Sequence, residues 1–248
     1  MSATVYDQHA RFYIDFVDAS LANGRLDVTL DAMRSCLGDR IAGARICDVC
    51  CGEGYLGRYL ATHGAREVVG VDLSAALVDE ARSRADDPRL SYRVDDAHAL
   101  GSIGDAEFDI VVSQLAMMDI PDHRRMFAAV RRVSKPGAAF VFSLLHPCFE
   151  GRPFHVTEAP AFVVDDRGEP IAYAVRRYAS EGHFQSGGTG VRGRMGSYHR
   201  RLSTYINDLL AAGFALERIE EPLAGVTADR GGLFAEVPTV LVVAATAV

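Results

Sequence analysis

Short apolar runs alternate with amphipathic stretches from Arg45 to the end of the chain. Runs rich in Val and Ile between Gly, Asp or Pro residues predict strands, and apolar residues spaced by three or four predict helices. Strands are expected near residues 45–49, 67–71, 90–94, 108–113, 138–144, 214–220 and 237–245, and helices near 54–63, 74–84, 121–134 and 202–212. This alternation predicts an α/β fold, with a mostly parallel sheet and helices on both faces.

Local signals mark several ends of these elements. Ser74 is a suitable N-cap for the second helix, and Gly213 ends the last one. Pro136 and Gly137 are expected to stop the helix near 121–134.

The first forty residues carry aromatic side chains at helical spacing. Tyr6, Phe12, Tyr13 and Phe16 can share one helix face, so residues 1–40 are expected to form a helical cover. The stripe either packs on the core or contacts a ligand.

Residues 146–199 interrupt the α/β alternation with Gly, Pro and Arg. A segment of this length is too long for a plain connection, so it is expected to be a lid or a small β-rich insertion that recognises the substrate. Residues 41–145 and 200–248 then form one core.

The loop after the first strand contains Gly52, Gly54 and Gly57, and Asp72 ends the second strand. This spacing matches a βαβ unit that binds an adenosine cofactor, in which glycines allow close backbone approach and the acid accepts hydrogen bonds from ribose hydroxyls. Asp48 and Glu53 lie where a dinucleotide enzyme would cradle a pyrophosphate. Two carboxylates there would repel a diphosphate and attract the ammonium and sulfonium of S-adenosylmethionine.

The same residues carry a resemblance to a known family. The run Asp48-Val49-Cys50-Cys51-Gly52-Glu53-Gly54 resembles the first motif, D-x-G-x-G-x-G, of class I S-adenosylmethionine-dependent methyltransferases, with Cys50 in place of the first glycine. Further matches follow in the family's order at residues 70–74, 95–97, 108–113 and 132–137. The resemblance implies a Rossmann-like, seven-stranded, mostly parallel sheet that closes on an antiparallel hairpin.

The resemblance also implies where the cofactor binds. Asp48, Cys50, Gly52 and Gly54 would lie near the methionine moiety, Asp72 at the ribose, Leu73 beside the adenine, Asp95, Asp96 and Ala97 around the adenine amino group and ring nitrogen, Gln114 beside the transferring methyl group, and Tyr13 over the cofactor. The cofactor would be S-adenosylmethionine, the product S-adenosylhomocysteine, and no metal would be required.

Three histidines are candidates for a general base. His146 follows the fifth strand and is the first candidate, with His123 and His199 as further candidates, because histidine titrates near neutral pH. A structural histidine that bonds a lid carbonyl is the commoner outcome, and an amine or aromatic carbon acceptor needs no strong base.

Other chemistry-bearing residues have two interpretations. Arginines in and beside the insertion either bind an anionic group on the substrate or form a solvated surface: Arg176, Arg177, Arg192, Arg194, Arg200 and Arg201. Cys47, Cys50 and Cys51 lie along a strand and its turn, where buried thiols are expected rather than a metal site.

Composition narrows the range of partners. The formal net charge is −7 without a dense Lys/Arg run, so nucleic acid is not expected as substrate. The chain has neither an apolar run of ~20 residues nor a secretory signal, so a cytoplasmic protein, monomeric or homodimeric and without membrane contact, is expected.

These features favour a small-molecule O- or N-methyltransferase, and analogy with the family suggests one that tailors a secondary metabolite. The alternatives are a protein that binds S-adenosylmethionine without methyl transfer, in a cyclase or regulatory role, and an NAD(P)-dependent oxidoreductase.

Overall fold

Seven strands form one sheet in the order β10-β11-β5-β4-β1-β2-β3. The computed structural model describes residues 4–149, 162–185, 188–223 and 236–248. The strands are β1 (Arg45–Val49), β2 (Glu67–Asp72), β3 (Leu90–Val94), β4 (Phe108–Ser113), β5 (Ser134–Leu145), β10 (Phe214–Glu220) and β11 (Val240–Ala247). β1 to β5 pair in parallel, whereas β11 is antiparallel to β5 and to β10. The predicted mostly parallel sheet with a closing hairpin is confirmed.

The strand order places a crevice beside β1. The chain proceeds from β1 through β2 to β3 on one side and returns to place β4 on the other side of β1. Connections therefore diverge at the carboxyl ends of β1 and β4, which is where open α/β sheets bind ligands.

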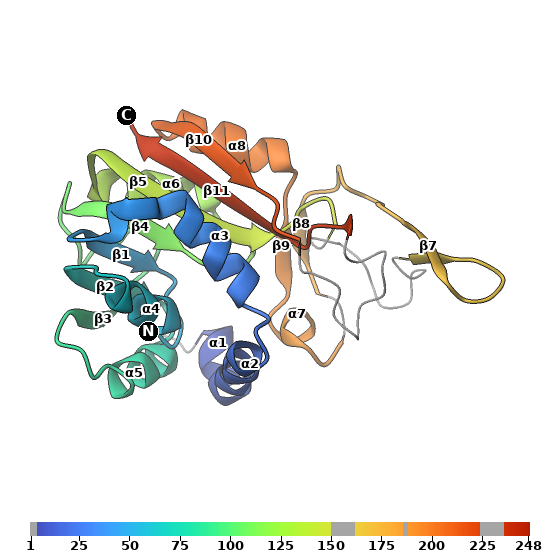
Figure 1. Ribbon diagram of the computed structural model, residues 1–248, viewed down its shortest axis with the longest axis horizontal. Helices are drawn as coiled ribbons and strands as arrows, with labels where there is room; N and C mark the ends of the chain where they lie inside the picture. Colours follow the sequence, from blue (N-terminus) through green and yellow to red (C-terminus); the bar gives the residue numbers. More distant parts are fainter. Residues whose placement is uncertain (1–3, 150–161, 186–187, 224–235) are drawn as a thin grey trace.

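Helices cover both faces of the sheet (Figure 1). The longer ones are α2 (Ala10–Ala22), α3 (Asp27–Leu37), α4 (Tyr55–Thr62), α5 (Ala75–Ser83), α6 (His123–Val133) and α8 (Leu202–Ala211), and the short ones are α1 (Val5–Gln8), η1 (Gly38–Ile41), η2 (Met117–Asp119) and α7 (Val191–Arg194). α3 and α4 pack on one face, and α6 and α8 on the other. No helix among the described residues is both long enough and apolar enough to cross a membrane.

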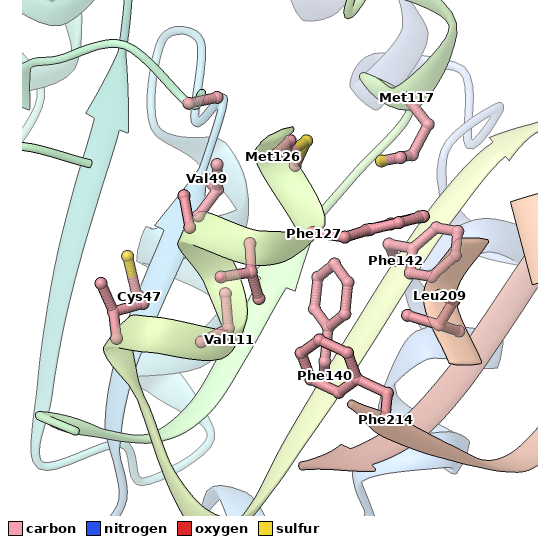
Figure 2. Close-up of a cluster of buried hydrophobic side chains, with 14 of the residues drawn as sticks. Cys47, Val49, Val111, Met117, Met126, Phe127, Phe140, Phe142, Leu209 and Phe214 are labelled. Atoms are coloured by element: carbon pink, nitrogen blue, oxygen red, sulfur yellow. The ribbon is translucent and has the colours of Figure 1, made fainter. Parts of the chain in front are cut away.

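An aromatic cluster fills the space beneath α6 and α8 (Figure 2). The Phe127 ring of α6 lies 5.7 Å from that of Phe142, and the Phe140 ring lies 5.4 Å from that of Phe214. Alternate residues of β5 therefore face this cluster, as a buried strand with period two requires. The cluster anchors β4 and β5, whose carboxyl ends form part of the site.

One predicted helix end needs correction. α6 ends at Val133, and Pro136 and Gly137 belong to β5 rather than terminating the helix. Ser134 is already extended, and its hydroxyl donates to the Val130 carbonyl at 2.7 Å, which satisfies a carbonyl of the last helical turn. The strand thus begins four residues before the predicted start at 138.

The first forty residues divide between two roles. α3 packs against β5 and β11 and belongs to the core, whereas α1 and α2 contact α5 near the carboxyl edge of the sheet. The covering part of this segment is therefore formed by α1 and α2 (Figure 1).

The insertion after β5 forms two small antiparallel sheets. β6 (Phe162–Val164) pairs with β7 (Pro170–Tyr173), and β8 (Gly182–Phe184) pairs with β9 (Ser197–His199). The β7 end of the insertion projects away from the main sheet (Figure 1), whereas β9 contacts η2 beside the crevice.

Candidate functional site

A cavity of about 240 Å³ lies at the carboxyl edge of the sheet. The loops after β1 to β4 form one side, and α1, α2 and residues 195–198 form the other. It is lined by nine of the eleven residues predicted to bind the cofactor: Tyr13, Cys50, Gly52, Asp72, Leu73, Asp95, Asp96, Ala97 and Gln114. Asp48 lines a smaller neighbouring cavity that shares Cys50, Gly52 and Gln114 with the first. The sequence motifs therefore converge on one place.

The loop after β1 turns sharply at two positions with positive φ. Cys50 has φ 63° and Gly52 has φ 54°, both in the left-handed region. Glycine adopts this region freely, whereas a residue with a Cβ is strained there. Cys50 thus occupies the motif's glycine position at a conformational cost, and its side chain lines the cavity.

Gly54 serves packing rather than the cavity surface. A Cβ at Gly54 would lie 2.7 Å from the Tyr92 hydroxyl oxygen, and the same hydroxyl donates to the Gly54 carbonyl at 3.1 Å. With φ 85° it also begins α4 in a left-handed conformation. A glycine is therefore required at position 54 for the close approach of α4 to β3.

Asp72 is held by the backbone of two loops. Its carboxylate accepts the Gly52 N–H and the Ser74 N–H, both at 2.9 Å. Burial raises the pKa of Asp72, although these hydrogen bonds oppose the shift. A carboxylate has about four acceptor positions. Asp72 therefore keeps capacity for further donors such as a pair of hydroxyl groups.

Asp48 is a buried acid whose hydrogen-bonding capacity is only partly satisfied. It is 1% exposed, and its Oδ2 atom has no hydrogen-bond partner. Burial, together with the carboxylates of Asp72 and Glu53, raises the pKa of Asp48 to about 8. The Gly57 N–H donates to the carboxylate, but a buried carboxylate oxygen without a donor, such as Oδ2, is costly. A cationic ligand group beside Oδ2 would relieve this cost.

Glu53 differs from what its position in the loop suggests. Its Oε2 atom pairs with Arg58 at 2.6 Å and Arg84 at 3.3 Å. Two guanidinium groups therefore offset the charge of Glu53, although its Oε1 atom has no hydrogen-bond partner, whereas Asp48 has no ion-pair partner among the described residues.

The two acids after β3 have different surroundings. Asp95 accepts the Ser102 N–H at 2.8 Å, the Ser102 hydroxyl at 2.6 Å and the Gly101 N–H at 3.1 Å, so its carboxylate mainly holds its own loop. Asp96 Oδ1 accepts the His98 N–H and lies 2.7 Å from His98 Nδ1. His98 also lines the cavity, although the sequence motifs did not indicate it.

Tyr6, Asp119 and Arg192 form a second group that sequence reasoning missed. Arg192 Nη1 lies 2.5 Å from Asp119, and the Tyr6 hydroxyl donates to the same carboxylate. The Tyr6 and Tyr13 rings meet edge to face at 5.1 Å. These residues come from α1, α2, η2 and α7, and we call them the covering wall. Their positions in the sequence carry no shared motif, so only the fold brings them together.

Gln114 joins this cavity to another one. It follows β4, is 8% exposed, and neither of its side-chain amide atoms has a partner. A further cavity of about 350 Å³ shares Tyr13, Gln114, Leu115 and Met118 with the first. Two spaces therefore meet at one unsatisfied amide group.

The three histidines predicted as candidate bases do not appear among the described lining residues of these cavities. His123 Nε2 bonds Asp208 at 2.7 Å between α6 and α8, and burial lowers its pKa. His146 Nε2 lies 2.7 Å from Glu221, and His199 Nε2 donates to the Tyr178 carbonyl at 2.9 Å. Each side chain is used in a local structural contact.

Cys47 and Cys51 are buried, as expected of apolar thiols, and Cys50 is half-buried at the cavity. Burial raises the pKa of Cys47, Cys50 and Cys51. Within the described residues, no group of three His, Cys, Asp or Glu side chains is placed to hold a metal ion.

Comparison with known proteins agrees with this geometry. A family model described as a methyltransferase domain matches residues 46–137. The S-adenosylmethionine-dependent methyltransferase of Mesorhizobium loti is 30% identical with a TM-score of 0.74, over 87% of this chain and 96% of that one. A protein from Listeria monocytogenes, solved as a putative S-adenosylmethionine-dependent methyltransferase, is 27% identical with a TM-score of 0.73, over 90% and 99%.

A curated relative has a known acceptor. The N-demethylindolmycin N-methyltransferase of Streptomyces griseus is 29% identical over 73% of this chain and 75% of the relative. Sequence, sheet order and the convergence of the motifs at one edge thus agree, and the chain belongs to the class I S-adenosylmethionine-dependent methyltransferases.

Proposed function

We propose that this methyltransferase transfers a methyl group to an oxygen or nitrogen atom of a small molecule. The observation that carries the proposal is the meeting of two cavities at Gln114, one lined by the cofactor motifs and one by the covering helices and the insertion. The cavity of about 350 Å³ suits a compact acceptor rather than a polymer. The Streptomyces griseus relative, named for N-methylation of a small molecule, supports the same acceptor class.

In this proposal Asp48 and Asp72 hold opposite parts of S-adenosylmethionine. Asp48 Oδ2, which has no partner, receives the ammonium group, and Asp72 accepts hydrogen bonds from the ribose hydroxyls. The residues fit this cofactor because an unpaired buried carboxylate favours a cation and disfavours a diphosphate.

The adenine lies between Leu73 and the loop after β3. Asp96 accepts the amino group and Ala97 offers its backbone N–H, while Asp95 keeps that loop in shape. Tyr13, Cys50 and Gln114 surround the sulfonium end.

When bound, S-adenosylmethionine supplies a methyl carbon whose bond to sulfur breaks with both electrons moving to sulfur. The chain's own contribution is alignment and exclusion of water, because such a displacement needs the acceptor in line with the breaking bond. Tyr13 and Leu115 shield the junction, and Gln114 can orient the acceptor through its amide.

Calorimetric titration tests the cofactor assignment. S-adenosylmethionine and S-adenosylhomocysteine should bind, and NAD should not. Asp48→Asn should weaken S-adenosylmethionine binding by roughly tenfold or more, because a charged hydrogen bond contributes about 1.5 to 3 kcal/mol. Asp79→Asn, which removes an exposed carboxylate from α5, is the matched control and should change nothing. NAD binding with no affinity for S-adenosylmethionine would overturn the proposal.

Mass spectrometry of reactions with a panel of small phenols, amines and carboxylic acids then identifies the acceptor. A product heavier by one methyl group, with stoichiometric S-adenosylhomocysteine, is the expected result. Transfer to a protein or nucleic acid, and not to small molecules, would contradict the proposed acceptor class.

A further inference from the structure

The cavity of about 350 Å³ beyond Gln114, which we call the acceptor chamber, has a largely apolar lining. The aromatic and aliphatic side chains of its lining include Tyr13, Phe16, Tyr55, Leu115, Met118 and Leu145. The chamber therefore presents ring faces and methyl groups rather than charges.

The positive charge in the lining of the chamber is balanced by a neighbouring carboxylate. Arg192 is the charged residue of its described lining, and its guanidinium already pairs with Asp119 and donates to the Gly196 carbonyl at 3.1 Å. Burial raises the pKa of Tyr13 and Tyr55, so both hydroxyls stay neutral. An ionised ligand would meet no unpaired opposite charge among the described lining residues, and burying an unpaired charge is costly.

Gln114 supplies a buried and unsatisfied polar group among the described lining residues of the chamber. Its amide oxygen can accept a hydrogen bond and its amide nitrogen can donate one, and neither has a partner. A ligand with a single polar atom at the junction would satisfy this group and leave its remaining surface against the apolar walls.

We propose that the acceptor chamber binds an uncharged aromatic or heterocyclic molecule that is oriented by one hydrogen bond to Gln114. The inference rests on the proposed function, because it takes the chamber to hold the methyl acceptor. A volume of about 350 Å³ is near the lower end of small-molecule sites, which fits a one- or two-ring compound.

Three indoles that differ in charge at one position test this inference. They are 5-aminoindole, which is neutral, indole-5-carboxylate, which is anionic, and 5-(aminomethyl)indole, which is cationic. Each is titrated by calorimetry into the protein saturated with S-adenosylhomocysteine at pH 7.5. The neutral compound should bind at least about tenfold more tightly than either ion, because the ions lose solvation without gaining a partner.

Two variants locate the binding within the chamber. Gln114→Leu should weaken 5-aminoindole about fivefold to tenfold. Arg192→Met leaves Asp119 without its guanidinium, so the cationic indole should gain about fivefold or more in affinity while the anionic one does not. Gln185→Leu, an exposed glutamine of the insertion, is the matched control and should bind all three compounds as the parent does.

The outcomes separate the two proposals. Tighter binding of the carboxylate than of the neutral indole, or no binding of 5-aminoindole to a protein that binds S-adenosylhomocysteine, would overturn the inference and leave the cofactor assignment intact. A folded protein that does not bind S-adenosylhomocysteine would overturn the proposed function itself. The thermal midpoint of each variant shows that it is folded.

Discussion

The two sides of the site are built in opposite ways. The carboxyl ends of β1, β2 and β3 and the loops that follow them, which we call the strand-end wall, include Asp48, whose Oδ2 is unpaired, and Asp72, whose acceptor capacity is only partly used. The covering wall instead pairs its charges internally, as Arg192 does with Asp119. The difference indicates that the strand-end wall is suited to bind a cation, whereas the charges of the covering wall largely cancel each other.

The largest expected effect is on the strand-end wall. Asp72→Ala removes the acceptor of the Gly52 and Ser74 N–H groups and of the proposed ribose bonds, so S-adenosylmethionine affinity should fall by about 30-fold to 100-fold, or about 2 to 3 kcal/mol. Calorimetry measures the change. An unchanged dissociation constant would show that Asp72 does not contact the cofactor.

Substitutions in the covering wall should change the stability of the folded protein. Arg192→Met leaves the Asp119 carboxylate, 17% exposed, without its cation, and should lower the free energy of unfolding by about 2 kcal/mol. Adding Asp119→Asn should restore part of the loss, because the unpaired charge is removed. Denaturation by urea measures both. If the double variant is no more stable than Arg192→Met, the pair is not coupled.

Stability should depend on pH through Asp48. Its pKa is raised to about 8 in the folded protein from an ordinary value of 3.8. The folded protein therefore binds the Asp48 proton more tightly than the unfolded chain does. The stability that this difference contributes to the folded protein is fully present below about pH 4 and is lost as the pH rises through about 8. The upper limit of the slope is about 1.4 kcal/mol per pH unit.

Asp48→Asn should flatten this slope between pH 5 and pH 8, and urea denaturation at these two values measures it. The exposed replacement Asp79→Asn should retain the parent slope. Equal slopes for parent and Asp48→Asn would mean that Asp48 is ionised at ordinary pH in the folded protein.

The smallest effect is expected at Cys50, where the strand-end wall is strained. Cys50→Gly should raise the free energy of unfolding by about 0.5 kcal/mol, because relief of the left-handed conformation slightly exceeds the added entropy of the unfolded chain. Cys50→Ala keeps the strain and should not be stabilising. Equal stability of both variants would show that strain at residue 50 is negligible.

The predicted strands and helices are confirmed where local pattern decides them. β1 and β4 match their predicted spans, and Ser74 caps α5 through the Leu77 N–H as expected. The start of β5 was misplaced because Pro136 and Gly137 usually mark breaks, whereas pairing of Ser134 with Phe108 extends the strand through them. Tertiary pairing thus outweighed local propensity at that point.

The histidines illustrate a limit of reasoning from sequence order. His146 directly follows β5, as predicted, yet its ring nitrogens contact Glu221 and the Cys148 N–H. His98, which was not singled out, lines the cavity because Asp96 orients it there. The direction of a side chain depends on its neighbours in space, which position along the chain does not specify.

The residues of the strand-end wall could be predicted from local sequence, because they lie in short motifs where glycine conformation, strand ends and acidic side chains follow from the order of neighbouring residues. Which of the two acids Asp48 and Glu53 lacks an ion-pair partner depends on packing, since Arg58 and Arg84 pair with Glu53 and not with Asp48. Packing also brings the covering wall together, where Arg192 meets Asp119 from 73 residues away. Contacts of that separation depend on packing the whole chain, and no local pattern encodes them.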